Sequence, residues 1–192
     1  MEAMGVYRKV LRAMAAARGK KVVGVRWVDT NKAREGDKAD IRSRLVAKQF
    51  AVGTRDDIFA ATPSLEAIKI MISMTASSGH GHTPRKRLMV LDVKRAFLHA
   101  EITEEVYVEL PAEAKAESDG DVVGHLVKAM YGTRGAPMCW QTHITQHLKS
   151  MGFEPGIANP CIFQHRQRDL QMVMHVDDIL VSGEPKGLQW CR

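Results

Sequence analysis

The sequence predicts an α+β fold, because strand patterns and helix patterns follow one another without the regular order of βαβ units. Apolar, β-branched runs at Val22–Val28 and Leu88–Val93 are typical of strands. Apolar residues recur with a helical period after Thr62 and again between Trp140 and Met151.

The N-terminal third begins with residues 1–20, which we interpret as a basic helix, with a frayed tail as the alternative. Strands at Val22–Val28 and Ile41–Phe50 flank the polar segment Asp29–Asp40, which lacks the apolar residues needed to bury itself. These segments predict a long basic hairpin with a mobile tip.

Two helices follow the hairpin. Thr62 as the cap and Pro63 at the first helical position predict the start of one helix. A second helix should end at Gly152, where a C-terminal glycine is expected. The apolar residues expected to face the core are Leu65, Ile68, Ile72 and Ala76 in the first helix, and Trp140, Ile144, Leu148 and Met151 in the second.

Charge is distributed unevenly along the 192 residues. Residues 1–55 hold 14 of the 28 Lys and Arg residues but only 5 of the 22 Asp and Glu residues. A lobe this basic favours a polyanionic partner, although a merely solvated charged surface is the simpler alternative. Three cysteines without a C-x-x-C pair argue against a disulfide framework or a zinc site, and no apolar run is long enough to cross a bilayer.

The strongest chemical signal is the pair Asp177-Asp178, which stands between the apolar strands Gln171–Val176 and Ile179–Ser182. We expect the two aspartates to form the two-residue connection of a tight hairpin. Adjacent carboxylates repel each other unless a cation is present, and Mg²⁺ prefers such oxygen ligands. An Asp-Asp pair in a turn is nevertheless common without any metal.

Asp92 supplies a third carboxylate at the end of an apolar strand, where a buried charge would need a partner. It lies 85 residues before Asp177, so the meeting of the two is a prediction about the fold. Two metal ions held by these aspartates would suit nucleotidyl transfer.

Seven short segments, in order, resemble the reverse transcriptase domain of copia-type LTR retrotransposon Pol polyproteins from about Val22 to Gly183. The segments are R44-L-V-A-K-Q-F, D57-I-F-A-A-T-P, L91-D-V-K-R-A-F-L, E104-E-V-Y-V, K128-A-M-Y-G with A136-P and Trp140, G152-F with N159-P-C-I-F, and H175-V-D-D-I-L-V-S-G. The order of the segments, rather than any one of them, makes the resemblance specific.

The resemblance implies a polymerase palm, which is an antiparallel sheet backed by helices, with a fingers lobe from the basic hairpin. It implies that Asp92, Asp177 and Asp178 hold two Mg²⁺ ions, or Mn²⁺ instead, with help from the backbone of Val93. It also implies that the backbone amides of Val93 and Lys94 contact the triphosphate oxygens. The partners would be a primed RNA or DNA template and deoxynucleotides.

Phe97 lies five residues after Asp92, where the resemblance places an aromatic ring that blocks the ribose 2′-hydroxyl. Plain core packing is the alternative for this ring. Arg42, Arg44 and Lys48 are candidates for phosphate contacts and share a face of their strand if no bulge intervenes. For these three, a solvated strand edge is the alternative.

The sequence departs from the family pattern at four positions. Gly135 stands where the family has a glutamine that would touch the incoming nucleotide. Gln49 stands in place of a glycine, His175 in place of a tyrosine, and Asn159 in place of an aspartate. The loss at position 135 bears most directly on activity.

The sequence predicts three regions: a basic extension (1–20), a reverse transcriptase fingers and palm core (21–183) and a truncated tail (184–192), with no residues left for a thumb. The expected function is RNA-directed DNA polymerisation. The alternatives are an inactive, truncated retroelement remnant that binds nucleic acid through its basic lobe and, more weakly, an unrelated metal-dependent phosphodiesterase. We expect an intracellular protein, in the cytoplasm, the nucleus or a virus-like particle.

Overall fold

The computed structural model describes residues 1, 4–34, 37–50, 58, 60–79 and 84–191, and these residues form two compact units. Unit 1 comprises Met1–Ile58 and Phe97–Cys139, and unit 2 comprises Phe59–Ala96 and Trp140–Arg192. Helices and sheets are mixed without regular alternation, as predicted. Asp57 and Phe59 of the family segments lie outside the described residues.

Unit 1 is built on a four-stranded sheet with the order β1-β7-β6-β2. The strands are β1 (Tyr7–Leu11), β2 (Val22–Val23), β6 (Tyr107–Val108) and β7 (Val122–Leu126). β1 and β6 both pair antiparallel with β7, whereas β2 pairs parallel with β6. Side chains from this sheet and from residues beside its strands form the main core of the unit, including Val6, Val108, Leu110, Leu126 and Met130.

The predicted N-terminal helix is wrong over its first half. Residues Tyr7–Leu11 form β1, and only the six residues Arg12–Ala17 form a helix, α1. Val6 is fully buried, and Tyr7 is opposite Leu126 in the ladder to β7. Pairing with a strand more than 100 residues away therefore overrides the local helical pattern.

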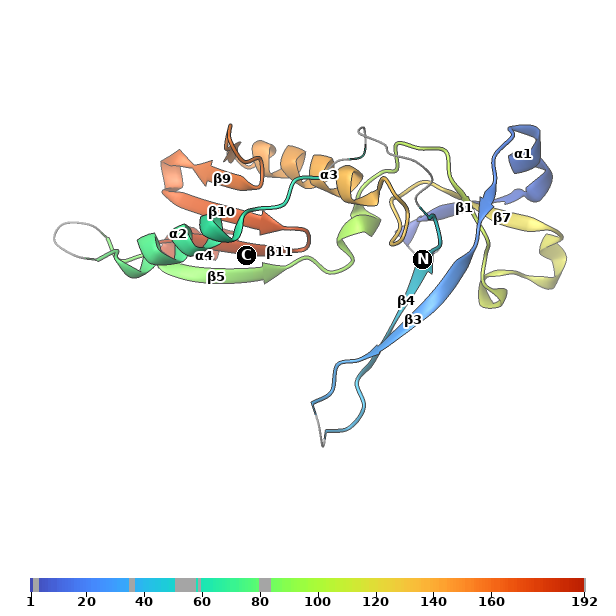
Figure 1. Ribbon diagram of the computed structural model, residues 1–192, viewed down its shortest axis with the longest axis horizontal. Helices are drawn as coiled ribbons and strands as arrows, with labels where there is room; N and C mark the ends of the chain where they lie inside the picture. Colours follow the sequence, from blue (N-terminus) through green and yellow to red (C-terminus); the bar gives the residue numbers. More distant parts are fainter. Residues whose placement is uncertain (2–3, 35–36, 51–57, 59, 80–83, 192) are drawn as a thin grey trace. The chain divides into compact units, whose positions relative to one another are not determined.

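A second sheet of unit 1 is the two-stranded hairpin of β3 (Val25–Asn31) and β4 (Ile41–Ala47), drawn in blue and cyan in Figure 1. Its register runs without interruption from Asn31 opposite Ile41 to Val25 opposite Ala47. Gly24 separates β3 from β2, so the predicted strand Val22–Val28 is divided in two. The basic hairpin predicted from the sequence is present.

Unit 2 is built on a five-stranded sheet in which every neighbouring pair is antiparallel, with the order β5-β11-β10-β9-β8 (Figure 1). The strands are β5 (Arg87–Asp92), β8 (Glu154–Pro155), β9 (Ile162–His165), β10 (Leu170–His175) and β11 (Asp178–Gly183). The apolar residues of β10 and β11 are mostly buried. In this order β11 lies between β5 and β10.

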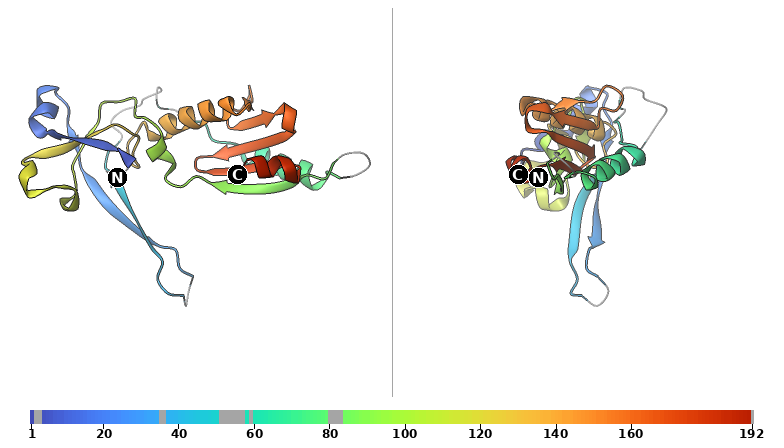
Figure 2. Two further views of the ribbon diagram at one scale, coloured as in Figure 1. Left: turned by 180° about the vertical axis from the view of Figure 1, so that it is seen from behind. Right: turned by 90° about the vertical axis from the view of Figure 1, so that its left-hand side faces the viewer.

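Helices lie on both faces of this sheet. The Thr75 hydroxyl of α2 (Leu65–Ala76) lies 2.6 Å from the Ser182 hydroxyl on one face. Helix α4 (Pro185–Trp190) lies against Leu170 on the other face, as the opposite views in Figures 1 and 2 show. None of the helices in the described part of the chain is long and apolar enough to cross a membrane.

Helix α2 differs from the prediction at its start and on its buried face. Its N-cap is Ser64, whose hydroxyl accepts a hydrogen bond from the Ala67 amide at 3.2 Å, so Thr62 is not the cap. Met71 and Thr75 are buried, whereas the predicted core residues Leu65 and Ile72 are 59% and 43% exposed. Apolar residues lie on most sides of this helix, so its spacing did not identify the buried side.

Helix α3 (Ala136–Ser150) confirms the prediction for three of its four core residues, whereas Met151 lies just after the helix and is half-buried. Trp140, Ile144 and Leu148 are buried, and Gly152 follows the helix with a left-handed φ of 93°. The remaining helical segments are short 3₁₀ turns at Ala96–His99, Ala112–Ala114, Glu117–Asp119 and Arg166–Arg168.

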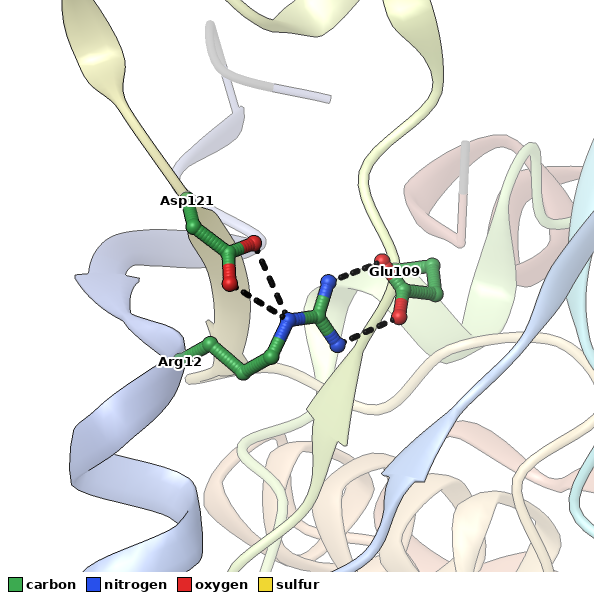
Figure 3. A network of polar contacts seen from close by, with 3 residues as sticks. All are labelled: Arg12, Glu109 and Asp121. Atoms are coloured by element: carbon green, nitrogen blue, oxygen red, sulfur yellow. Dashed lines mark hydrogen bonds and ion pairs between the residues drawn. The ribbon is translucent and has the colours of Figure 1, made fainter.

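A polar network fastens α1 to the sheet of unit 1 (Figure 3). Arg12 donates through Nη1 and Nη2 to the two carboxylate oxygens of Glu109 at 2.7 and 2.9 Å, and through Nε to both oxygens of Asp121 at 3.0 Å. These bonds raise the pKa of Arg12 and lower the pKa of Glu109. The network therefore joins α1 to the residues beside β6 and β7 through charge-assisted bonds.

Two further ion pairs act on the same unit. Arg18 donates to Glu105, and Lys9 donates to Asp119 at 2.7 Å. Hydrogen bonds from these cations lower the pKa of Glu105 and the pKa of Asp119. Protonation of these carboxyl groups at acid pH would weaken the unit, because each has a folded-state pKa below its ordinary value.

Replacement of Arg12 by Met should lower the free energy of unfolding by about 0.5–1 kcal/mol, because the carboxylates lose charge-assisted bonds that solvent partly screens. The difference from the unmodified chain should be full above the ordinary glutamate pKa. It should vanish as the pH falls through the lowered pKa of Glu109. Urea unfolding followed by circular dichroism, at neutral pH and at about pH 3, measures both effects.

Arg8→Met is the matched control, because Arg8 is an exposed arginine on β1. Arg8→Met should change the free energy of unfolding little at either pH. Equal losses in the two variants would show that the network adds nothing beyond a surface charge.

Candidate metal and nucleotide site

The sheet of unit 2 brings Asp92 and Asp178 together. Asp92 is the last residue of β5, Asp178 is the first residue of β11, and the two are direct partners across the antiparallel ladder. Side chains of such partners lie on the same face, with Cβ atoms about 4.5–5.5 Å apart. The meeting predicted from the sequence was that of Asp92 with Asp177, whereas the residue opposite Asp92 in the ladder is Asp178.

The turn before β11 consists of Val176 and Asp177, since His175 is opposite Asp178 in the ladder. The prediction that Asp177 and Asp178 form the connection is therefore wrong by one residue. Asp178 belongs to the strand, where it pairs with β5, and Asp177 lies in the turn. The two carboxylates are therefore separated: Asp178 lies within the sheet and Asp177 lies beyond its end.

Val176 has a φ of 57°, in the left-handed region that a β-branched residue rarely adopts. Among the described non-glycine residues, only Arg95 and Asp169 share this region, so Asp177 does not. A two-residue hairpin turn with a positive φ at its first position normally has glycine there. The turn thus carries backbone strain of about 1–3 kcal/mol.

Two hydrogen bonds from outside the hairpin hold this turn. The indole Nε1 of Trp140 donates to the Val176 carbonyl oxygen at 2.7 Å. The Val93 amide donates to the Asp177 carbonyl oxygen at 3.0 Å, one position beyond the pairing of Asp92 with Asp178. The sequence placed Trp140 on a buried helix face but gave no signal for its bond to the turn.

The aspartates are accessible to a ligand. Asp92 and Asp178 are exposed and Asp177 is half-buried, so the expectation that Asp92 is a buried charge is wrong. Like charges directly opposite each other in a ladder are destabilising unless a cation lies between them. Carboxylate oxygens are hard ligands, which suit Mg²⁺ and, secondarily, Mn²⁺.

The described residues contain no group of three His, Cys, Asp or Glu side chains that already converge on a metal position. The fit to a divalent ion therefore comes from the backbone register and the donor chemistry. His175, the last residue of β10, lies opposite Asp178 in the ladder. Its side chain is exposed and adds a planar ring to this edge.

Val93 and Lys94 follow Asp92 directly. Because the Val93 amide is bonded to Asp177, its carbonyl is the backbone atom that a metal would use. Lys94 is exposed in the turn that follows β5. Its predicted contact with a triphosphate stays a prediction.

Phe97 belongs to unit 1, in the 3₁₀ turn Ala96–His99. Its ring is half-buried and lies 4.7 Å from the Tyr131 ring, centroid to centroid. It packs against a small cluster that contains Ala100, Ala129, Ala136 and Cys139. Packing of this kind fixes the ring, which a steric role at a sugar would also require.

Gly135 is buried, and the structure leaves no room for a side chain at this position. A Cβ at this position would overlap the carboxylate of Glu104, so the space that a longer residue would need is filled. Gln49 lies beside it, and its carboxamide oxygen accepts a hydrogen bond from the Arg134 amide at 2.8 Å. Two departures from the family pattern, at positions 49 and 135, are thus neighbours in unit 1.

The basic residues of the hairpin share one face. Arg42 and Arg44 are two residues apart on β4, with no bulge between them, and are opposite Thr30 and Val28. The Lys48 amide continues the ladder through a 2.8 Å bond to the Gly24 carbonyl oxygen. Arg26, opposite Val46, adds to this face a fourth cation that was not predicted from the sequence.

The predicted site residues therefore fall into two groups, each described within its own unit. Unit 2 contains Asp92, Val93, Lys94, Asp177 and Asp178, and unit 1 contains Arg42, Arg44, Lys48, Phe97 and Gly135.

Comparison with known proteins adds an independent finding. The model of the family described as "Reverse transcriptase (RNA-dependent DNA polymerase)" matches residues 8–188. The chain is 30% identical over 179 residues to the Retrovirus-related Pol polyprotein from transposon TNT 1-94 of Nicotiana tabacum, which is 89% of this chain and 13% of that polyprotein. It is 32% identical over 167 residues to the polyprotein from transposon RE2 of Arabidopsis thaliana, which is 84% of this chain and 11% of that polyprotein.

A shorter match is to the putative transposon Ty5-1 protein YCL074W of Saccharomyces cerevisiae, 33% identical over 95 residues. That match covers 48% of this chain and 31% of the yeast protein. The chain thus spans only a small part of the length of its curated relatives.

Replacement of Asp92 by Asn should stabilise the chain by about 0.2–1 kcal/mol in the presence of a chelator, because it removes a like-charge pair. Added Mg²⁺ should raise the thermal midpoint of the unmodified chain and leave that of Asp92→Asn nearly unchanged. Differential scanning calorimetry with EDTA and with Mg²⁺ measures both shifts.

Glu184→Gln is the control, since Glu184 is an exposed acid just after β11. It should respond to Mg²⁺ like the unmodified chain. If Asp92→Asn keeps the full Mg²⁺ response, then Asp92 is no part of a cation site.

Proposed function

The chain belongs to the reverse transcriptase (RNA-dependent DNA polymerase) family, and from this premise we propose that it adds deoxynucleotides to a primer 3′-hydroxyl on an RNA or DNA template. The resemblance of its sequence to copia-type Pol polyprotein domains is confirmed by these matches. The proposed reaction is a nucleotidyl transfer that depends on divalent metal ions.

The pairing of Asp92 with Asp178 is the observation that carries this proposal. The register places two acidic residues opposite each other, with Asp177 in the adjoining turn. No packing role needs this arrangement, because the two paired side chains are exposed and carry like charge. A cation bound between the two carboxylates would offset their repulsion and so would account for the arrangement.

Two Mg²⁺ ions, or Mn²⁺ in their place, would activate the 3′-hydroxyl and neutralise the charge on the leaving pyrophosphate. In this proposal Asp92, Asp177 and Asp178 provide the ligand oxygens, and the carbonyl of Val93 provides a further one. The backbone bonds at Val93 and in the β5–β11 ladder hold these groups in place before the substrate arrives.

The remaining predicted residues would handle the nucleotide and the template. Lys94 would contact the triphosphate through its backbone amide, and Phe97 would exclude the 2′-hydroxyl of a ribonucleotide by contact with its rigid ring. Gly135 would leave the nucleotide position without the side chain that the family has there. Arg42, Arg44 and Lys48 would bind phosphates, for which arginine forks are well suited.

Within this proposal the five-stranded sheet of unit 2 is the palm, and the β3–β4 hairpin of unit 1 is part of the fingers. The antiparallel pairing of the sheet and the helices on its faces support the first assignment. The exposed arginines on the hairpin support the second. The regional limits at residues 20 and 183, and an intracellular location, stay predictions.

Replacement of Asp177 by Asn should reduce Mg²⁺-dependent extension of a DNA primer on an RNA template by about a thousandfold or more, because one ligand charge is lost. Single-turnover primer extension with radiolabelled primer measures the rate. The assay is run on the purified chain and on the chain continued into the C-terminal part of a related Pol polyprotein.

Glu184→Gln serves again as the control and should extend primers normally. Extension by the Asp177→Asn variant at the unmodified rate would reject the assignment of the carboxylates. Absence of extension by the unmodified protein in both contexts would reject activity in this copy.

A second candidate function is nucleic-acid binding without catalysis, and the basic face of the hairpin favours it. The face presents Arg26, Arg42, Arg44 and Lys48, and only Arg42 has an acidic neighbour, Asp40 at 3.6 Å, among the ion pairs of the described residues. Cations on one face of a two-stranded ribbon can follow a phosphate backbone. This function would not need the aspartates.

Replacement of Arg42, Arg44 and Lys48 together by Ala should weaken binding to single-stranded nucleic acid and reduce the dependence of log affinity on log salt concentration by up to about 2. Fluorescence anisotropy across a salt series measures the slope. The matched control is Arg8, Lys20 and Lys21 changed together to Ala, which removes the same charge from exposed positions elsewhere in the basic lobe. Equal loss in both triple variants would show that net charge, and not the hairpin face, binds the polyanion.

A further inference from the structure

We propose that Trp140 is a positioning residue, whose indole N–H holds the strained Val176–Asp177 turn in the conformation that aims the Asp177 carboxylate. This inference rests on the proposed function, because it assumes that Asp177 is a metal ligand. It concerns a residue on α3, outside the set of carboxylates and backbone atoms assigned to the metal.

The strain comes from Val176. Its φ of 57° is unfavourable for any β-branched side chain, and a chain left to itself would relax this turn toward a conformation with negative φ. Glycine would adopt the same turn without cost. A valine at this position therefore needs an outside contact to keep the turn as it is.

Trp140 supplies that contact at the atom that controls the turn. The Val176 carbonyl belongs to the central peptide of the two-residue connection, between Val176 and Asp177. Rotation of that peptide would carry the carbonyl oxygen away from the indole nitrogen, which lies 2.7 Å from it. The peptide plane ends at the Cα of Asp177, and the Val93 bond holds the carbonyl on the other side of that Cα, so the two bonds together set the direction of the Asp177 Cα–Cβ bond.

The indole itself is held firmly. Trp140 is only 3% exposed, and its ring stacks on that of His143 with centroids 6.0 Å apart. A buried indole N–H normally finds a hydrogen-bond partner, and this one is directed at a backbone carbonyl of the candidate site. The donor is therefore preorganised, and no reorganisation of α3 is needed to reach the turn.

A second bond separates the role of Trp140 from that of the sheet. The Val93 amide donates to the Asp177 carbonyl and so ties the far side of the turn to β5. The sheet alone thus fixes the carbonyl of Asp177, but only Trp140 among the described hydrogen bonds fixes the carbonyl of Val176. Loss of the indole donor should free the central peptide while the ladder stays intact.

The test uses three variants of the full chain: Trp140→Phe, Val176→Gly and the double variant. Trp140→Phe keeps an aromatic ring and removes the donor. Val176→Gly removes the steric strain. Trp190→Phe is the matched control, because Trp190 is a partly buried tryptophan of the same unit that stacks near Phe153 and His165.

The first readout needs no catalysis. Backbone amide spectra of ¹⁵N-labelled protein should show exchange broadening at Asp177 and Asp178 in Trp140→Phe, and none in Trp190→Phe. The Mg²⁺ concentration that half-saturates the shifts of these amides should rise about fivefold to tenfold in Trp140→Phe, as expected for loss of one buried hydrogen bond. In the double variant it should return to within about twofold of Val176→Gly alone, because the strain that required the clamp is gone.

The second readout is primer extension. Trp140→Phe should lower kcat about fivefold to tenfold and leave the KM for the deoxynucleotide nearly unchanged, since the nucleotide contacts lie elsewhere. If Trp140 only fills space, Trp140→Phe and Trp190→Phe will behave alike, and Val176→Gly will not rescue the double variant. Either result overturns the proposal.

The two proposals fail in different ways. If the unmodified protein extends no primer, but Trp140→Phe shows the broadening and the double variant its rescue, the polymerase function is rejected and the role of Trp140 is supported. Active protein with sharp Asp177 and Asp178 amides in Trp140→Phe would reject the role of Trp140 alone.

Discussion

The antiparallel register between β5 and β11 is the constraint on which the candidate site depends. Side chains alternate between the two faces of a sheet, so a slip of one residue would turn Asp178 away from the face that holds Asp92. The slip is prevented by apolar packing further along the same strand, where Ile179 and Val181 are buried on the other face. The core of unit 2 and the chemistry at its edge are therefore specified by one pattern. Any change that loosens the core near β11 would also disperse the carboxylates.

Much of the fold could be predicted from the sequence where local pattern and tertiary environment agree. The buried side of α3, the strand ending at Asp92 and the basic hairpin all follow from spacing that only one structure satisfies. The pattern failed where a distant partner decided the outcome. Tyr7–Leu11 resembles a helix until it is paired with β7, and α2 has apolar residues on too many sides to indicate which one is covered. In both cases the missing information lay in the packing and not in the segment itself.

The candidate site shows the same division. Asp92, Asp177 and Asp178 can be identified from the sequence because they stand within ordered family segments, whereas the residue types alone are common in turns and at strand ends. The residues that form the turn could not be predicted, because two aspartates fit a hairpin connection better than a connection that begins with a valine at positive φ. The contacts of Trp140 with Val176 and of Glu104 with the space beside Gly135 join residues 36 and 31 positions apart. No spacing rule connects such pairs, so only the folded chain reveals them.

The interleaving of the two units has a consequence for how this chain can be divided. The chain passes from one unit to the other at 58/59, at 96/97 and at 139/140, so each unit is assembled from two separate stretches. No single cleavage releases either unit intact, and a deletion that starts from one end removes part of one unit before it completes the loss of the other. Recombination between related elements would have to exchange both stretches of a unit to preserve its core. An exchange that preserves both cores must therefore transfer the two units together, so the basic hairpin and the aspartates are inherited as one piece.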